Sequence, residues 1–310
     1  MKTAVEPAHG SIVYSVDGLV AQALGIPHAP ELIPVIPKYV LCNEGAWSRP
    51  ASRLCRVIDE YGPRGLSRAL SKLSSLNKRD GVYGALVPYV ERWRTLLLID
   101  PREALEARIR SPRSQLDHTV LRISSVLRSL GVSLGELGLT GSLAAGIENP
   151  KFSDVDLVVY GARAARRVLE FFESSTIRGV ERREFGGLSV NPPVNTSWRR
   201  ARLEGVEVSW VGVPLEGELC TPLESYFKVP KPEKHAEKVL RIEPEQEESL
   251  LYPLCVKAET GEYLVSFEYN IAIIVYKGGV FRVKGLVDEN ETVVYLGLRE
   301  LPGELSSVDQ

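Results

Sequence analysis

The chain has 310 residues, of which 44% are apolar and 25% charged, with a formal net charge of −2. This composition is typical of a folded protein with two or three domains. The near-zero net charge excludes a global electrostatic attraction to nucleic acid, so any such binding needs a local basic patch. The first residues, MKTAVEPAHG, lack an apolar signal-peptide core, and there is no run of about 18 apolar residues. We therefore expect a cytoplasmic protein that does not enter a membrane.

Residues 1–110 are predicted to form a mixed, mainly helical N-terminal region. Short strands are expected at 11–15 and 32–41, and the leucine spacing after residue 50 predicts helices. Leu66, Leu70, Leu73 and Leu76 recur at near-helical spacing, with Lys and Arg around them. The basic face of this helix either meets phosphate or RNA, or it is a solvated surface.

Four cysteines, Cys42, Cys55, Cys220 and Cys255, form no CxxC pair and have no histidine at zinc-finger spacing. We expect them to be buried thiols in a reducing cytosol. The alternative is a Cys42–Cys55 or a Cys220–Cys255 bridge, which is expected if the protein comes from a hyperthermophile.

Residues 111–215 are predicted to form a second domain in which helices and strands alternate. An amphipathic helix over 116–130 precedes a short strand over 136–140 and a Gly141-Ser142 turn. A second strand is expected over 154–160 and a further helix over 162–173. This order predicts an α+β fold, with a mixed sheet and flanking helices.

The Gly141-Ser142 turn and the Asp154-x-Asp156 pair carry the chemistry of this segment. Gly141 lets the backbone bend or approach a ligand without a Cβ, and Ser142 is expected to cap a helix whose free N–H groups attract phosphate. Because side chains alternate along a strand, the two aspartates are expected on one face, about 7 Å apart. Such carboxylates bind hard divalent cations, with nucleotide phosphates as further ligands. The alternative is a chance occurrence of two common patterns.

The string TGSLAAGIENPKFSDVDLVVYG, residues 140–161, resembles the signature of the DNA polymerase β-like nucleotidyltransferase superfamily. It is most similar to an uncharacterised archaeal family of predicted nucleotidyltransferases. The resemblance implies a polymerase β-like core and Mg²⁺- or Mn²⁺-dependent transfer of a nucleoside monophosphate from an NTP, such as ATP, to a hydroxyl. In this chain it assigns nucleotide binding to Gly141, Ser142, Gly146 and Ser153, and metal binding to Asp154 and Asp156.

The chain departs from the family pattern at two positions. Many relatives have Arg directly before the second glycine, where this chain has Ala145, so one triphosphate contact is missing or supplied elsewhere. Active relatives also have a third carboxylate on a later strand. We assign this third carboxylate, and with it a third place as metal ligand, to Glu207. It alternates with Val206 and Val208 along a predicted strand and so lies on the polar face. A solvated strand position is the alternative reading of Glu207, and Glu204 is the second choice for the role.

Basic residues close to this strand are further candidates for nucleotide binding. Arg199 and Arg202 lie in the cluster Arg-Arg-Ala-Arg, and Trp198 precedes them. Trp198 is expected either to stack on a base or to pack in the core. The alternative for Arg199 and Arg202 is that they are solvated surface residues with no role in nucleotide binding.

Residues 216–248 are rich in Pro, Glu and Lys and are predicted to be a charged linker. From residue 249 the pattern changes to short runs rich in Val, Ile and Tyr, which predict strands at 252–256, 263–269, 272–276, 280–284 and 292–296. Lys277-Gly278-Gly279 is expected to form a hairpin turn. Residues 249–310 are therefore predicted to be a small β-barrel or sandwich.

Three functions are compatible with these features. The favoured one is a metal-dependent nucleotidyltransferase with Asp154, Asp156 and Glu207 as its catalytic carboxylates, and with RNA or another macromolecule as acceptor. The second is a catalytically inactive module of the same fold that binds RNA. The third is an antitoxin-like enzyme that modifies one protein, although the length of 310 residues argues against it.

Overall fold

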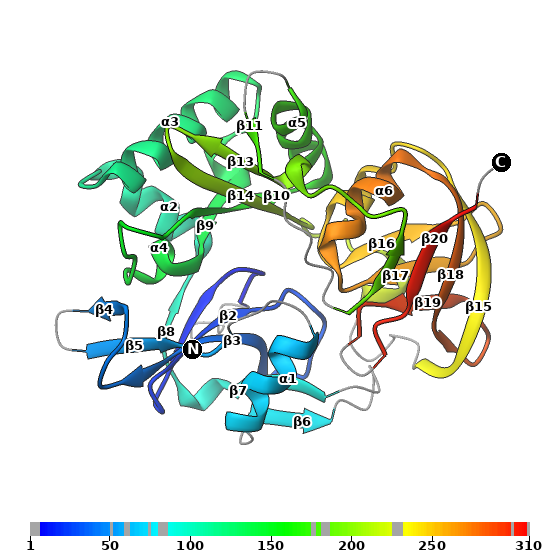
Figure 1. Ribbon diagram of the computed structural model, residues 1–310, viewed down its shortest axis with the longest axis horizontal. Coiled ribbons are helices and arrows are strands. Elements are labelled where there is room, and N and C mark those ends of the chain that lie inside the picture. Colours follow the sequence, from blue (N-terminus) through cyan, green and yellow to red (C-terminus); the bar gives the residue numbers. More distant parts are fainter. Residues whose placement is uncertain are drawn as a thin grey trace.

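The structure, a computed structural model, describes residues 7–49, 52–58, 63–73, 76–79, 86–174, 178–180, 187–224, 232–298 and 301–308. Within these residues the chain forms three β-sheets and six α-helices (Figure 1). The protein is therefore a mixed α/β protein in which strands predominate. No helix in this described part is long and apolar enough to cross a membrane.

The N-terminal sheet has eight strands: β1 (Ile12–Ser15), β2 (Leu19–Ala23), β3 (Leu32–Cys42), β4 (Trp47–Arg49), β5 (Ser52–Arg56), β6 (Asn77–Arg79), β7 (Leu86–Glu91) and β8 (Thr95–Ile99). Their order is β4-β5-β3-β2-β1-β8, and β7 pairs with both β3 and β6. Strands β1 and β3 confirm the predictions for 11–15 and 32–41.

The prediction of a mainly helical N-terminal region is wrong. Before residue 100, the described residues contain a single α-helix, α1 (Pro63–Lys72). Strands β7 and β8 are short apolar runs, which periodicity alone does not distinguish from helix. Pairing decided their structure, because β7 lies antiparallel to β3 and β8 lies antiparallel to β1.

The core sheet has the order β11-β13-β14-β10-β9. Its strands are β9 (Leu137–Thr140), β10 (Val155–Tyr160), β11 (Arg178–Gly179), β13 (Arg200–Leu203) and β14 (Val206–Val213). Helices α2 (Pro101–Arg110), α3 (Gln115–Ser129) and α5 (Ala162–Glu173) pack with Leu139, Leu157 and Val159 on one face. Helices α3 and α5 confirm the predicted helices over 116–130 and 162–173. Ser114 and Asp117 form a capping box, which sets the start of α3.

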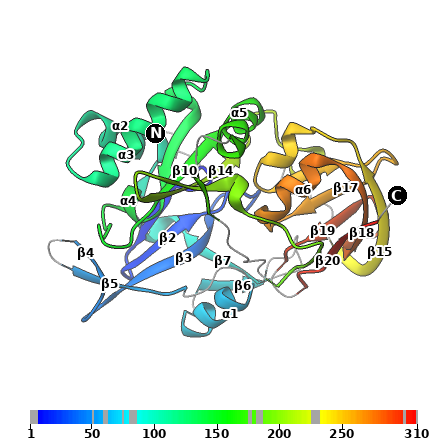
Figure 2. The same ribbon diagram turned by 45° about the horizontal axis from the view of Figure 1, so that its top comes forward.

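The other face of the core sheet is covered by the first residues of the N-terminal sheet region (Figure 2). Thr140 Oγ1 donates a hydrogen bond to the Gly10 carbonyl at 2.6 Å. Ala8 packs against Val158 and Tyr160 of β10. Because both faces are covered, β10 is buried on both sides after Asp156, which is why it reads as a continuous apolar run.

The C-terminal sheet contains seven strands: β12 (Ser189–Asn191), β15 (Pro232–Ile242), β16 (Leu254–Lys257), β17 (Tyr263–Ser266), β18 (Gly279–Asp288), β19 (Val293–Leu296) and β20 (Glu304–Ser307). Four of the five strands predicted after residue 249 are present as β16, β17, β18 and β19. The strand predicted at 272–276 is wrong, because these residues form α6 (Ala272–Lys277). Gly278 is the C-cap of this helix, so the predicted hairpin turn is wrong too.

The predicted linker over 216–248 is in part a strand. Strand β15 pairs antiparallel with β18 along its length. Its charged side chains make ion pairs: Glu237 binds Arg282 of β18, and Lys234 and Lys238 bind Glu291 in the turn after β18. Alternating charge therefore reflects an exposed strand face rather than a linker. Residues 225–231 of the predicted linker lie outside the described residues.

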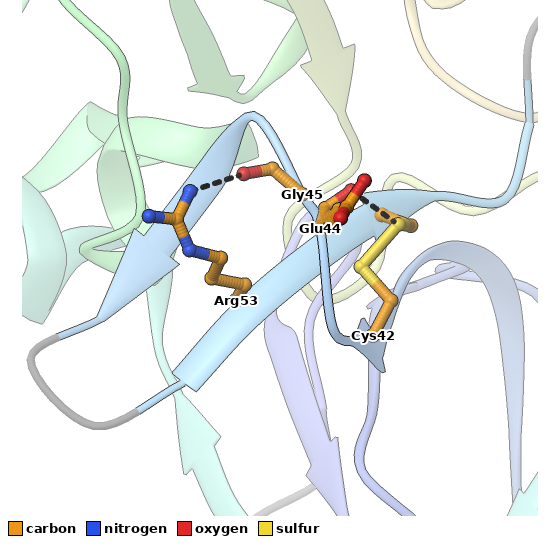
Figure 3. Close-up of a disulfide and its surroundings, with 5 residues drawn as sticks. Cys42, Glu44, Gly45 and Arg53 are labelled. Atoms are coloured by element: carbon orange, nitrogen blue, oxygen red, sulfur yellow. Dashed lines mark hydrogen bonds between the residues drawn. A yellow bond between two sulfur atoms is a disulfide. The ribbon is translucent and has the colours of Figure 1, made fainter.

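Both cysteine pairs form disulfides, so the expectation of buried thiols is wrong and the alternative pairing is confirmed. Cys42–Cys55 joins β3 to β5, where Cys55 Sγ lies 3.4 Å from the Glu44 carbonyl oxygen and Arg53 donates to the Gly45 carbonyl (Figure 3). Cys220–Cys255 ties the segment that follows β14 to β16, and thereby links the core to the C-terminal sheet.

An aromatic cluster joins the core sheet to the C-terminal sheet. The rings of Trp198 and Trp210 lie 5.3 Å apart, and the ring of Trp198 lies 5.4 Å from that of Tyr269. Tyr269 Oη accepts from the Gly212 N–H at 2.9 Å and donates to the Leu250 carbonyl at 2.6 Å. These contacts place the end of β14 directly against the C-terminal sheet.

Candidate active site

The turn between β9 and β10 begins with the short helix α4 (Gly141–Ala145). The N-cap of α4 is Thr140, so the prediction that Ser142 caps this helix is wrong. Ser142 Oγ instead donates to Ser153 Oγ at 3.1 Å, and Ser153 Oγ accepts from the Asn149 N–H at 2.9 Å. The two serines therefore hold together the two ends of the loop that leads into Asp154.

Gly141 lies directly against the Asp156 carboxylate. Its φ is +71°, a conformation that favours glycine, and a Cβ at this position would meet Asp156 Oδ2 at less than 3.0 Å. Ser209 Oγ, on the neighbouring strand β14, donates to Asp156 Oδ1 at 2.6 Å. The carboxylate is thus held between the turn and β14. Gly146, the left-handed C-cap of α4, has open space around it.

Three carboxylates gather on adjacent parallel strands. Val155 of β10 pairs with Val208 of β14, and Asp156 pairs with Ser209. Asp154 directly precedes Val155 and Glu207 directly precedes Val208, so the register brings Asp154 and Glu207 side by side. The Asp156 and Glu207 carboxylates, together with burial, raise the pKa of Asp154 to about 7, and the charge on Asp156 is the largest cause.

Arg200 on β13 makes an ion pair with one member of this cluster. Its guanidinium pairs with Glu207 at 3.1 Å, and both side chains are largely buried. It lowers the pKa of Asp154, but less than Asp156, burial and Glu207 raise it. The like charges of the cluster are therefore only partly neutralised by the protein.

This donor set fits a divalent cation. Buried, incompletely neutralised carboxylates are the ligands that Mg²⁺ and Mn²⁺ prefer. Within the residues that the structure describes, no group of three or more His, Cys, Asp or Glu side chains is arranged to hold a metal ion. Asp154 and Asp156 both line one cavity, while Glu207 is engaged by Arg200.

Two cavities meet at Asp156. The turn cavity, of about 140 Å³, is lined by Gly141, Ser142, Asp154 and Asp156, together with Lys38 and Arg56 of the N-terminal sheet. The junction cavity, of about 210 Å³, lies where the three sheets meet. Residues that line it include His9, Lys38, Asp156, Arg199, Arg200, Tyr252 and Asn270. Lys38, Asp156 and Arg200 line both cavities.

The N-terminal sheet supplies residues that the sequence did not single out. Tyr14 Oη donates to the Ala145 carbonyl at 2.6 Å, so this sheet packs on the turn that contains Ala145. Lys38 and Arg56 then line the turn cavity from β3 and β5. They are about one hundred residues or more away from the motif in the chain, and no local pattern connects them to it.

The predicted basic residues do not act on one surface. Arg199 lines the junction cavity, whereas Arg202 is exposed and lines a separate cavity beside Glu207 and Ser153. Trp198 is 3% exposed and packs in the aromatic cluster, so the core alternative is confirmed. Glu204 lies in the β13–β14 turn and pairs with Arg122, away from the aspartates.

Comparison with known proteins gave no relative: no family model, no curated protein and no solved structure matches the chain.

Proposed function

We propose that the protein is a metal-dependent nucleotidyltransferase, which moves a nucleoside monophosphate from an NTP to a hydroxyl and releases pyrophosphate. One observation carries this proposal. Asp154, Asp156 and Glu207 lie on adjacent parallel strands, and Asp156 touches the Gly141 turn. Charged oxygens and a phosphate-sized space thus share one small volume.

The turn cavity is the proposed triphosphate site. Lys38 and Arg56 provide positive charge there, and the Ser142 region provides polar contacts. These cations take the place of the arginine that relatives carry at the position of Ala145. Positive side chains at transferring phosphates stabilise the charge that develops on the leaving pyrophosphate.

Asp154 and Asp156 are the proposed metal ligands. When bound, a divalent ion supplies charge neutralisation and lowers the pKa of the attacking hydroxyl. Ser209 and Gly141 orient the Asp156 carboxylate, and Arg200 holds Glu207 beside Asp154. In this proposal Glu207 remains the third catalytic carboxylate, as the sequence predicts.

The test is transfer of label from each of four α-labelled NTPs in Mg²⁺ or Mn²⁺. Total RNA, a metabolite extract and the protein itself serve as acceptors. Asp156→Asn is expected to reduce labelling by about a hundredfold or more, the scale of losing one electrostatic stabiliser. Glu204→Gln is the matched control, since Glu204 is an exposed carboxylate that pairs with Arg122 at the surface. Labelling that is equal in both variants would refute the proposal.

A second candidate is an inactive module that binds RNA. The pairing of Glu207 with Arg200 favours it, because it leaves two carboxylates for metal instead of three. An inactive module binds RNA equally well with and without metal, and Asp156→Asn leaves that binding unchanged. A catalyst binds Mn²⁺ and an NTP together and loses this on the same substitution.

A further inference from the structure

The junction cavity is lined by residues from all three parts of the chain. His9, Gln22 and Lys38 come from the N-terminal region, Asp156, Arg199 and Arg200 from the core, and Tyr252 and Phe267 to Asn270 from the C-terminal region. His9 and Tyr252 close one side, with ring centroids 4.5 Å apart. The cavity reaches Asp156 but is separate from the Gly141-Ser142 turn, which lines the other cavity.

Arg199 lines this cavity with unused hydrogen-bonding capacity. Its Nη1 donates to Asn270 Oδ1 at 3.0 Å, and its guanidinium lies 5.0 Å from the centroid of the Tyr269 ring. Among the described residues it makes no ion pair with a carboxylate, and its buried Nε has no hydrogen-bond partner. A buried guanidinium is costly unless its donors and charge are satisfied. The Arg199 Nε donor is therefore open to an acceptor in the cavity, since Asp156 and Glu268 line the cavity without making an ion pair with it.

The charges around the cavity favour an anion at the Arg199 side. Lys38, Arg199 and Arg200 line it, against the two carboxylates Asp156 and Glu268. His9 adds no charge, because burial, Lys38 and Arg199 lower its pKa to about 3. Its Nδ1 accepts from the Gly25 N–H at 3.2 Å, so the neutral ring carries its proton on Nε2.

We propose that the junction cavity binds the carboxylate or phosphate group of a small-molecule acceptor, with Arg199 as its anion ligand. The acceptor role rests on the proposed nucleotidyl transfer, whereas the anion binding stands by itself. A volume of about 210 Å³ is below the usual range for drug-sized ligands, about 300–1,000 Å³, and fits a small metabolite. The proposed acceptor is therefore a small molecule, in place of the macromolecule favoured by the sequence.

This arrangement gives a balanced reaction. The anion is held at Arg199, and a hydroxyl of the same molecule lies beside Asp156, where the two cavities meet. The hydroxyl oxygen forms a bond to the α-phosphorus of the NTP, the bond from that phosphorus to the pyrophosphate oxygen breaks, and the hydroxyl proton passes to water. The products are the nucleotidylated metabolite, pyrophosphate and one proton.

Calorimetric titration of the full chain with three matched probes tests the anion site. Glycerol 3-phosphate carries a phosphate, glycerate carries a carboxylate, and glycerol is the uncharged control. We expect one anionic probe to bind with a stoichiometry near one and glycerol not to bind. The better of the two anions identifies the phosphate or the carboxylate as the group that is recognised.

Arg199→Gln is expected to lower the affinity for the anionic probe at least tenfold. Arg241→Gln is the charge-matched control, because Arg241 is exposed on β15 and pairs with Glu259. Lys38→Gln removes a second cation from the cavity lining and leaves Arg199 in place, and it is expected to weaken binding of the same probe. Thermal unfolding of each variant shows whether it is folded. If Arg199→Gln does not fold, Lys38→Gln still tests whether the cations of the cavity bind the anion.

Mn²⁺ and NTP titrations separate this proposal from the proposed function. Nucleotide binding without any anion binding overturns the junction site and leaves nucleotidyl transfer standing. Anion binding without nucleotide binding refutes nucleotidyl transfer and retains the site. Equal probe affinity in the wild type and in Arg199→Gln overturns the role of Arg199, and labelling of RNA alone in the transfer assay overturns the small-molecule acceptor.

Discussion

Replacement of Gly141 by alanine tests how the turn positions the Asp156 carboxylate. The φ of +71° costs an alanine about 1–2 kcal/mol. The new Cβ would also displace Asp156 Oδ2, which strains or breaks the hydrogen bond from Ser209, and a hydrogen bond to a charged group is worth about 1.5–3 kcal/mol. Alanine also lowers the conformational entropy of the unfolded chain, which stabilises the folded state by about 0.4–1 kcal/mol. We expect a net loss of about 2–4 kcal/mol.

Gly146→Ala is the matched control. Gly146 lies at the other end of α4 with φ +66°, but an added Cβ meets no atom within 4 Å. An alanine at this position has the same unfavourable backbone conformation but makes no contact with Asp156. We therefore expect the free energy of unfolding to fall by about 1 kcal/mol. Gly146 also lines neither cavity at Asp156.

Urea unfolding measures the two free energies, and calorimetry with Mn²⁺ measures the carboxylate site. Gly141→Ala is expected to lose both stability and Mn²⁺ affinity, whereas Gly146→Ala keeps its Mn²⁺ affinity. Equal loss of stability and equal Mn²⁺ affinity in the two variants would mean that the Asp156 carboxylate is not held by its contact with the turn.

Three further predictions concern charge and crosslinks. Asp154→Asn is expected to raise the free energy of unfolding at pH 8 without metal by up to about 4 kcal/mol, because the pKa of Asp154 is raised to about 7 and its ionised form is disfavoured in the folded state. The variant should also weaken Mn²⁺ binding, and a loss of stability would contradict the like-charge account. The pKa of His9 is lowered to about 3, so only the unfolded chain gains this proton as pH falls from 6.5, and stability decreases by up to about 1.4 kcal/mol per pH unit. In His9→Asn, whose amide oxygen can accept from the Gly25 N–H, urea unfolding at pH 5 and 6.5 should lack this contribution, and an unchanged difference would refute it. Replacing Cys220 and Cys255 together by serine is expected to cost about 3–4 kcal/mol through the entropy of the open loop, since 35 residues separate them, and an unchanged midpoint of unfolding would oppose this.

Several elements were predictable because their signals are local. Helix α3 has a capping box at its start and regular apolar spacing, and α5 has an apolar face with Val168, Leu169 and Phe172 buried. Strand β10 was predicted from alternation and lies where expected, with Val155, Leu157 and Val159 buried on the helix-covered face. Local backbone preference and side-chain periodicity suffice for such segments.

Other elements depended on partners far away in the chain. The apolar run of α6 is as compatible with a strand as with a helix, and tertiary packing decided for helix. The charged residues of β15 became a strand because β18 offers a full-length partner. The disulfides required the cysteines to be brought within bonding distance by β3, β5 and β16.

By itself, the sequence determined the spacing of Gly141, Asp154 and Asp156 and the alternation that puts both aspartates on one face of a strand, because these depend on a few neighbouring residues. The tertiary structure alone decided that Glu207 lies beside Asp154, through the parallel register of β10 and β14. It also decided that Lys38, Arg56 and His9 come to the same place, because the N-terminal sheet packs on the face of the core that carries the carboxylates. Such contacts join segments that lie more than fifty residues apart in the chain, and no pattern within either segment specifies them.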